Sequence, residues 1–184
     1  NLINLTSLNL SDCDLQNVDG LANLTNLTSL DLGGCRSLKN VDGLANCTKL
    51  TSLDLSDCYS LQNVDDLANC TKLTSLDLSS CNALQTIDGL ANLTNLTSLD
   101  LSYCSYLSVR PANNRMTTRN EVAEYQDKSR FVMALRDGDA KALSGYKDRE
   151  SLDLSYCRYI QNIDGLANLT NLTSLDLNSC NALQ

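Results

Sequence analysis

The residues of this chain that could do chemistry are cysteines and aspartates, since the sequence has nine cysteines and no histidine. Seven cysteines recur once in each copy of a repeated pattern: Cys13, Cys35, Cys58, Cys81, Cys104, Cys157 and Cys180. Such a row is typical of buried, reduced thiols rather than of a disulfide framework, which uses an even number. Cys47 and Cys70 replace leucine elsewhere in the repeat, and we expect them to be buried too.

An aspartate stands four residues before six of these seven cysteines, where a strand would turn it outward. Neighbouring strands lie about 4.8 Å apart, so carboxylates in register would repel one another by roughly 1 kcal/mol per pair in water. Three interpretations stay open: a basic or repetitive ligand, bound Ca²⁺, or a solvated acidic face produced by duplication of one repeat. We call these residues the acidic column: Asp31, Asp54, Asp77, Asp100, Asp153 and Asp176.

This pattern offers little to catalysis. The carboxylates form a uniform row, whereas general acid and base catalysis needs carboxyl groups in different environments. Gly33-Gly34 is the only glycine cluster, and it lacks the basic residue and helix start of a phosphate loop. We therefore expect no enzyme activity and assign no catalytic residue, cofactor or metal site.

The repeat that positions these side chains is clearest from Leu50 to Lys72, LTSLDLSDCYSLQNVDDLANCTK. Its first residues alternate apolar and polar at period two, as a short strand with one buried face requires. Leu61, Val64, Leu67 and Cys70 then follow at intervals of three, which favours 3₁₀ or irregular turns. The frame recurs to give seven copies, beginning at Leu5, Leu27, Leu50, Leu73, Leu96, Arg149 and Leu172. Seven copies predict a solenoid.

The frame resembles the leucine-rich repeat, LxxLxLxx(N/C)xL, and is most similar to the short bacterial internalin type, whose repeats also carry a GLANLTNL return. Cysteine stands here where internalins usually have asparagine. The resemblance covers residues 1–107 and 150–184. It implies an α/β fold, a right-handed solenoid with a parallel sheet on its concave face and short 3₁₀ or irregular segments on its convex face. It also implies protein recognition and bacterial origin.

Residues 108–149 interrupt the repeats. They contain nine of the fourteen Lys and Arg residues, and no repeat frame fits them. We expect a helical insertion within repeat 5, between repeats 1–5 (residues 1–107) and repeats 6–7 (residues 150–184), all in a single domain. The bare start and end of the sequence suggest that flanking repeats or caps are missing and that the chain is a fragment of a longer array.

Thr118-x-x-Glu121 has the pattern of a capping box and predicts the start of a helix. The helix should end near Asp137-Gly138, and a shorter helical turn should follow over residues 139–144. An apolar stripe predicts that the helix packs against the repeats rather than forming a flexible loop: Val122, Tyr125, Val132 and Leu135. We place the basic side chains on the polar faces: Arg119, Lys128, Arg130 and Arg136.

Seven of the eight aromatic residues lie between positions 103 and 159. Tyr103 and Tyr156 occupy equivalent positions in consecutive coils, as do Tyr106 and Tyr159, so each pair should stack about one strand spacing apart. Tyrosine and arginine often anchor interfaces. The candidate protein-binding residues are Tyr103, Tyr106, Tyr156, Tyr159, Arg158 and Tyr59. Alternatively, the rings lie beneath the inserted helix and only support it.

The net charge of −8 disfavours nucleic acid as a partner. No stretch approaches the roughly 20 apolar residues of a membrane span, and no signal peptide is evident. The free thiols and the many N-x-(S/T) sequons favour the cytoplasm or another reducing compartment, with the cell surface or secretion as the alternative. We expect a non-enzymatic module that binds an unknown protein partner. The alternatives are a structural spacer and a Ca²⁺-dependent adhesion module.

Overall fold

The structure is a computed structural model that describes residues 2–183. It divides into two compact units, which are described separately. The first unit contains Asn1–Leu107 and Ala112–Glu124, and the second contains Ser108–Pro111 and Tyr125–Gln184. No helix among the described residues is long and apolar enough to cross a membrane.

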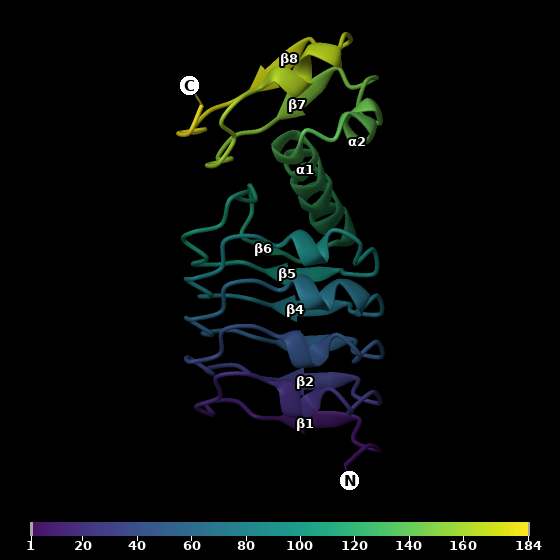
Figure 1. Cartoon of the computed structure of the whole chain (residues 1–184), viewed down its shortest axis with the longest axis vertical. Helices are drawn as coiled ribbons and strands as arrows, with labels where there is room; N and C mark the ends of the chain where they lie inside the picture. The colour runs from purple at the N-terminus through teal and green to yellow at the C-terminus, as the bar shows by residue number, and fades with distance from the viewer. Residues whose placement is uncertain (1, 184) are drawn as a thin grey trace. The chain divides into compact units, whose positions relative to one another are not determined.

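The first unit is a leucine-rich repeat solenoid in which each repeat forms one coil (Figure 1). Its parallel strands are β1 (Ser7–Asn9), β2 (Ser29–Asp31), β3 (Ser52–Asp54), β4 (Ser75–Asp77) and β5 (Ser98–Asp100). The register pairs each serine, leucine and aspartate with its counterpart one repeat later. The serines and aspartates therefore share one face, and the central leucines point into the core, as the alternation predicts.

The opposite side of each of the first four coils is a 3₁₀ helix, as the three-residue spacing predicts. These are η1 (Asp19–Leu21), η2 (Asp42–Leu44), η3 (Asp65–Asn69) and η4 (Asp88–Leu90). Glycine at one position of this segment lets successive coils approach closely. A Cβ added at Gly43 would lie 1.9 Å from the carbonyl oxygen of Val18, one coil earlier. The lack of a side chain at Gly43 therefore permits the close approach of the first two coils. In the third coil Asp66 stands at this position, within the longer 3₁₀ helix η3.

All nine cysteines are free thiols, and every one except the half-buried Cys13 is buried. Five thiols of the main row donate a hydrogen bond to a leucine carbonyl of the preceding coil, over 3.3 Å from Cys58 to Leu32 and 3.0 Å from Cys104 to Leu78, and likewise from Cys35, Cys81 and Cys180. Cys157 instead donates to the carbonyl of Ser155 in its own coil. Burial raises the pKa of the Cys58 thiol to about 12, so it stays protonated at neutral pH. The predicted burial of the cysteines is confirmed for every one except Cys13.

The insertion contributes a strand that the sequence did not predict. β6 (Arg115–Met116) pairs antiparallel with β5, and the backbone N–H of Leu101 donates to the carbonyl of Asn114 over 2.7 Å. β6 takes the edge of β5, and the strands of repeats 6 and 7 form a separate two-stranded sheet.

Helix α1 (Arg119–Asp137) begins in the first unit and ends in the second. Its predicted capping box is confirmed, since the backbone N–H of Glu121 donates to Thr118 Oγ1 over 3.3 Å and the N–H of Thr118 donates to Glu121 Oε2 over 3.1 Å. The predicted apolar stripe is buried along its whole length. The helix ends where predicted, at Asp137, and the next residue is Gly138, whose φ of +65° suits glycine.

The second unit continues with α2 (Ala140–Ser144), β7 (Ser151–Asp153), η5 (Asp164–Asn168) and β8 (Ser174–Asp176). β7 and β8 form a two-stranded parallel sheet in the register of the first unit. Arg149 replaces the usual leucine before β7. Its guanidinium lies over the ring of Tyr146, 4.9 Å from the centroid, and hydrogen-bonds the carboxylate of Asp127. These contacts explain how a charged residue fits at that position.

Candidate functional site

Each aspartate of the acidic column has a structural role at the end of its strand. One carboxylate oxygen accepts a hydrogen bond from the backbone N–H two residues later, from Ser56 to Asp54 and from Ser79 to Asp77 over 2.8 Å. The same bond forms at Asp31, Asp100, Asp153 and Asp176. This turn ends the strand after three residues and accounts for an aspartate in every copy.

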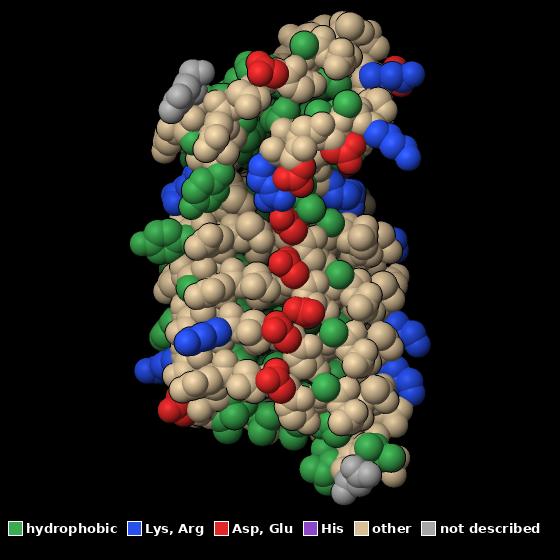
Figure 2. Space-filling model, viewed as in Figure 1, with side chains coloured by type: hydrophobic (Ala, Val, Ile, Leu, Met, Phe, Trp, Pro, Cys, Tyr) green, Lys and Arg blue, Asp and Glu red, His purple; other side chains and the backbone are tan. Residues whose placement is uncertain are grey.

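In the first unit, hydrogen-bond donors occupy both ends of the acidic column. The side-chain amide of Asn9 donates to Asp31 Oδ2 over 2.8 Å, and Arg115 Nε lies 3.4 Å from Asp100 Oδ2. Asp54 and Asp77 lie between them, so the interior of the column stays acidic. Figure 2 shows acidic side chains following one another across the coils. The repulsion expected from the sequence is therefore relieved at the two ends of the row.

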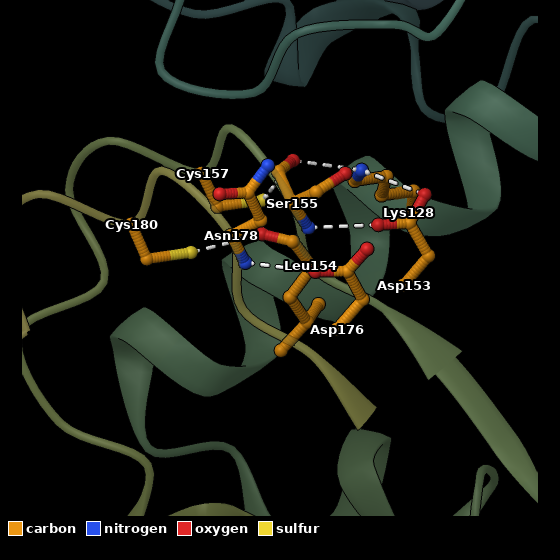
Figure 3. Close-up of polar contacts among 8 residues, drawn as sticks. All are labelled: Lys128, Asp153, Leu154, Ser155, Cys157, Asp176, Asn178 and Cys180. Atoms are coloured by element: carbon orange, nitrogen blue, oxygen red, sulfur yellow. Dashed lines mark hydrogen bonds and ion pairs between the residues drawn. The ribbon is translucent and has the colours of Figure 1, made fainter. Parts of the chain in front are cut away.

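In the second unit, Lys128 of α1 meets the acidic column (Figure 3). Its Nζ donates to the carbonyl of Ser155 over 2.9 Å and lies 3.4 Å from Asp153 Oδ2. The Lys128 side chain is only 14% exposed, although we had placed it on a polar face of the helix. Burial acts to raise the pKa of Asp153, but hydrogen bonds from Ser155 and the charge of Lys128 outweigh it and lower that pKa.

The carboxylates are not gathered as a metal site would need. Among residues 2–183, no group of three or more Asp, Glu or Cys side chains is arranged to hold a metal ion. Calcium takes six to eight oxygen ligands, whereas each strand of the column offers one carboxylate that is already used in a turn. The Ca²⁺ interpretation therefore has no geometric support.

The candidate tyrosines lie on what we call the strand-exit rim, the turns that follow the strands; in the fifth coil this is residues 100–106. Tyr103 is 78% exposed and Tyr106 is 60% exposed. The alternative in which these rings lie beneath the inserted helix is therefore wrong. Figure 2 shows hydrophobic side chains projecting at the edge of the coils.

Tyr103 has an unfavourable backbone conformation. Its φ is 64°, in the left-handed region, where a bulky residue is rare. The equivalent positions of the four earlier coils also have positive φ, but small or polar residues occupy them: Asp12, Gly34, Asp57 and Ser80. Strain of this kind clusters at functional sites. An exposed, strained tyrosine where the four earlier coils have small or polar residues is the strongest indication of a binding role in the first unit.

The remaining candidates fall into two places. In the first unit, the guanidinium of Arg36 lies over the ring of Tyr59, 5.6 Å from its centroid. In the second unit, Tyr156 is 48% exposed and Tyr159 is 52% exposed, beside the partly exposed Arg158. Tyr156 shares the strained conformation of Tyr103, with a φ of 59°. The predicted stacking of tyrosines from consecutive coils joins residues of the two units and stays a prediction.

The second unit also contains a hollow of about 450 Å³ between the end of α1, α2 and η5. Leu135, Leu143 and Gly165 form its apolar part. Its charged residues include Arg136 and Asp137, which hydrogen-bond each other over 2.8 Å. Sequence analysis did not find this hollow, because its residues come from three segments that only the fold brings together.

The repeats of the first unit decide the family. A family model described as the leucine-rich repeat domain of the endo-β-N-acetylglucosaminidase EndoS matches residues 4–103, more than half of the chain. The chain belongs to the leucine-rich repeat family. A comparison with curated protein sequences finds no match. The recognition of leucine-rich repeats from the sequence is confirmed.

Several solved structures resemble this leucine-rich repeat chain. The internalin InlF of Listeria monocytogenes is 25% identical, with 86% of this chain and 36% of that chain covered and a TM-score of 0.47. The internalin InlC2 of the same species is 20% identical, with 94% and 80% covered and a TM-score of 0.49. A structure of the TLR13–ssRNA13 complex is 26% identical, with 55% and 19% covered and a TM-score of 0.39. The chain spans about a third of the InlF structure.

Proposed function

We propose that this chain is a non-enzymatic leucine-rich repeat scaffold that binds a protein partner through the strand-exit rim of its first unit. Tyr103 and Tyr106 are the anchors of this site. One observation carries the proposal: the fifth coil exposes 78% of a tyrosine in a left-handed backbone conformation that small or polar residues adopt in the four earlier coils. A spacer would gain nothing from that substitution, because strain without a compensating contact only lowers stability.

The chemistry of the rim fits protein recognition. A tyrosine ring offers a large contact area with only two side-chain torsions to immobilise, and its hydroxyl can form a hydrogen bond at the edge of an interface. Of the four earlier coils, the third alone carries a tyrosine, Tyr59, and Arg36 lies over its ring. The buried thiols further support a proposal that the protein works in a reducing compartment.

The experiment uses a photo-crosslinking amino acid in place of Tyr103 in the full chain. A matched variant carries it in place of Asn46, an exposed residue outside the strand-exit rim. The expected result is a discrete crosslinked protein at position 103 that is missing at position 46. The purified partner should then bind Tyr103→Ser, which copies Ser80 of the preceding coil, at least about ten-fold more weakly than it binds the natural chain. Unchanged affinity would contradict this assignment of the site.

The alternative function is a spacer between flanking domains. It predicts that Tyr103→Ser and Tyr106→Ala leave all binding unchanged and affect stability alone. The same crosslinking and affinity measurements therefore separate the two functions.

A further inference from the structure

The net negative charge of this chain comes entirely from the first unit. That unit contains six Lys and Arg residues against fourteen Asp and Glu residues, a net charge of −8. The second unit contains eight of each and is neutral. The exposed tyrosines at positions 103 and 106 therefore belong to the acidic unit. The negative charge of this unit attracts positively charged segments during their approach and repels negatively charged ones.

The chain itself shows how its tyrosines bind a cation. In the first unit, Arg36 lies over the ring of Tyr59 on the same rim. In the second unit, Arg149 lies between the ring of Tyr146 and the carboxylate of Asp127. Both contacts use arginine, and the second combines an aromatic face with a carboxylate. In the fifth coil, Tyr103 follows Asp100 by three residues. Because Arg115 pairs with Asp100, the carboxylates that remain to attract a cation are those of Asp77 and Asp54 in the two preceding coils.

We infer that the strand-exit rim of the first unit recognises an arginine-bearing, basic segment of its protein partner. The guanidinium groups of that segment stack on Tyr103 and Tyr106, and the acidic column from Asp54 to Asp77 attracts their charge. This inference rests on the proposed function and specifies the chemistry of the partner.

Arginine fits this surface better than lysine. Its planar guanidinium is weakly hydrated, stacks on an aromatic face and can still donate hydrogen bonds to a carboxylate from its edge. The lysine ammonium is strongly hydrated and loses more by leaving water. A purely electrostatic surface would bind both residues equally, whereas a tyrosine rim discriminates between them.

The test uses fluorescein-labelled peptides of about ten residues in which serine alternates with arginine, lysine or glutamine. Fluorescence anisotropy measures their binding to the full chain at low salt, where a surface of this charge is least screened. We expect the arginine peptide to bind about five-fold more tightly than the lysine peptide and the glutamine peptide not to bind. Tyr103→Ser combined with Tyr106→Ala should abolish this preference, and both substitutions copy residues that the fourth coil already has.

The control is Asp54→Asn combined with Asp77→Asn. This double variant should weaken the binding of the arginine and lysine peptides by the same factor. The ratio of their affinities should stay unchanged, because the variant removes charge but no aromatic face. Equal affinities of the natural chain for the two basic peptides, or no binding of either, overturn the inference. So does an arginine preference that survives loss of both tyrosines. A crosslinked partner whose contact segment lacks arginine overturns the inference while the proposed function stands.

Discussion

Arg115 stands opposite Asp100 in the antiparallel register of β6 and β5, and its Nε lies 3.4 Å from Asp100 Oδ2. The insertion thus provides both the last strand of the first sheet and a cation for the last carboxylate of its acidic column. Lys128 has the corresponding role in the second unit, where it lies 3.4 Å from Asp153 Oδ2. The insertion therefore supplies one basic residue to the column in each unit.

These two ion pairs should differ in their effect on stability. Arg115 is 76% exposed, so Arg115→Gln should lower the free energy of unfolding by less than about 1 kcal/mol. Lys128 is 14% exposed and also bonds the Ser155 carbonyl, so Lys128→Met should cost about 1–3 kcal/mol. Urea unfolding followed by circular dichroism measures both, since the chain has no tryptophan. Equal costs would show that the Lys128 contacts add nothing.

Glycine at one position of the 3₁₀ segment should matter only where another coil precedes it. A Cβ at Gly43 would meet the Val18 carbonyl oxygen at 1.9 Å, whereas a Cβ at Gly20 would meet nothing within 4 Å. Gly43→Ala should therefore destabilise by roughly 2 kcal/mol or more, because the backbone must shift. Gly20→Ala is the matched control and should be neutral or stabilising by up to about 1 kcal/mol. Similar effects at both positions would contradict the role of coil spacing.

The thiol row should resist labelling in the native state. Burial raises the pKa of Cys58 to about 12 and that of Cys104 to about 11, so neither forms the reactive thiolate at neutral pH. A thiol-reactive dye should label the half-buried Cys13 first and the rest only on unfolding. Cys58→Ala should cost roughly 1–2 kcal/mol, since it removes a buried sulfur and its bond to the Leu32 carbonyl. Fast labelling of most thiols at pH 7 would contradict this prediction.

Stability should decrease at both extremes of pH. Burial raises the pKa of Cys58 and of Cys157 to about 12, so the stability that these thiols contribute is fully present below the unfolded value of about 8.5 and is lost as pH rises toward the folded value. The pKa values of Asp153 and Glu121 are lowered, so their contributions are present above about pH 4 and are lost as pH falls through the folded values. Melting temperatures measured from pH 3 to about pH 10 test both limits. In the Cys58→Ala variant, the decrease of the melting temperature at alkaline pH should be smaller than in the natural chain.

Local patterns were enough to predict most of the fold, because each coil repeats one alternating strand and one three-residue periodicity. The capping box of α1 was equally local. β6 could not be predicted, since two residues, Arg115 and Met116, show no alternation and pair only because β5 leaves an edge open. The burial of Lys128 depends in the same way on the carbonyl of Ser155, which is distant in sequence.

The candidate site was predicted by residue type but not by geometry. The concentration of tyrosines around the insertion identified Tyr103 and Tyr106, and their exposure excludes the alternative that they only support the helix. Their strain could not be predicted from one coil alone, because a positive φ at Tyr103 follows from the turn that Asp100 begins and that all seven repeats share. A comparison of the same position between coils, Ser80 with Tyr103, would have shown that a bulky residue replaces a small one in this turn.

The strained tyrosine should show opposite effects on stability and binding. A residue other than glycine in the left-handed region costs roughly 1–2 kcal/mol, and the second coil avoids this cost with Gly34, whose φ is 73°. Tyr103→Gly should therefore keep or raise the melting temperature, although glycine gains entropy in the unfolded chain. The same variant should bind the partner and the arginine peptide more weakly. Tyr103→Phe is the matched control: it keeps the strain and the aromatic face, so both stability and the arginine preference should stay near the natural values. A Tyr103→Gly chain that melts several degrees lower would show that the ring packs against the fold, and the rim would then lose its main anchor.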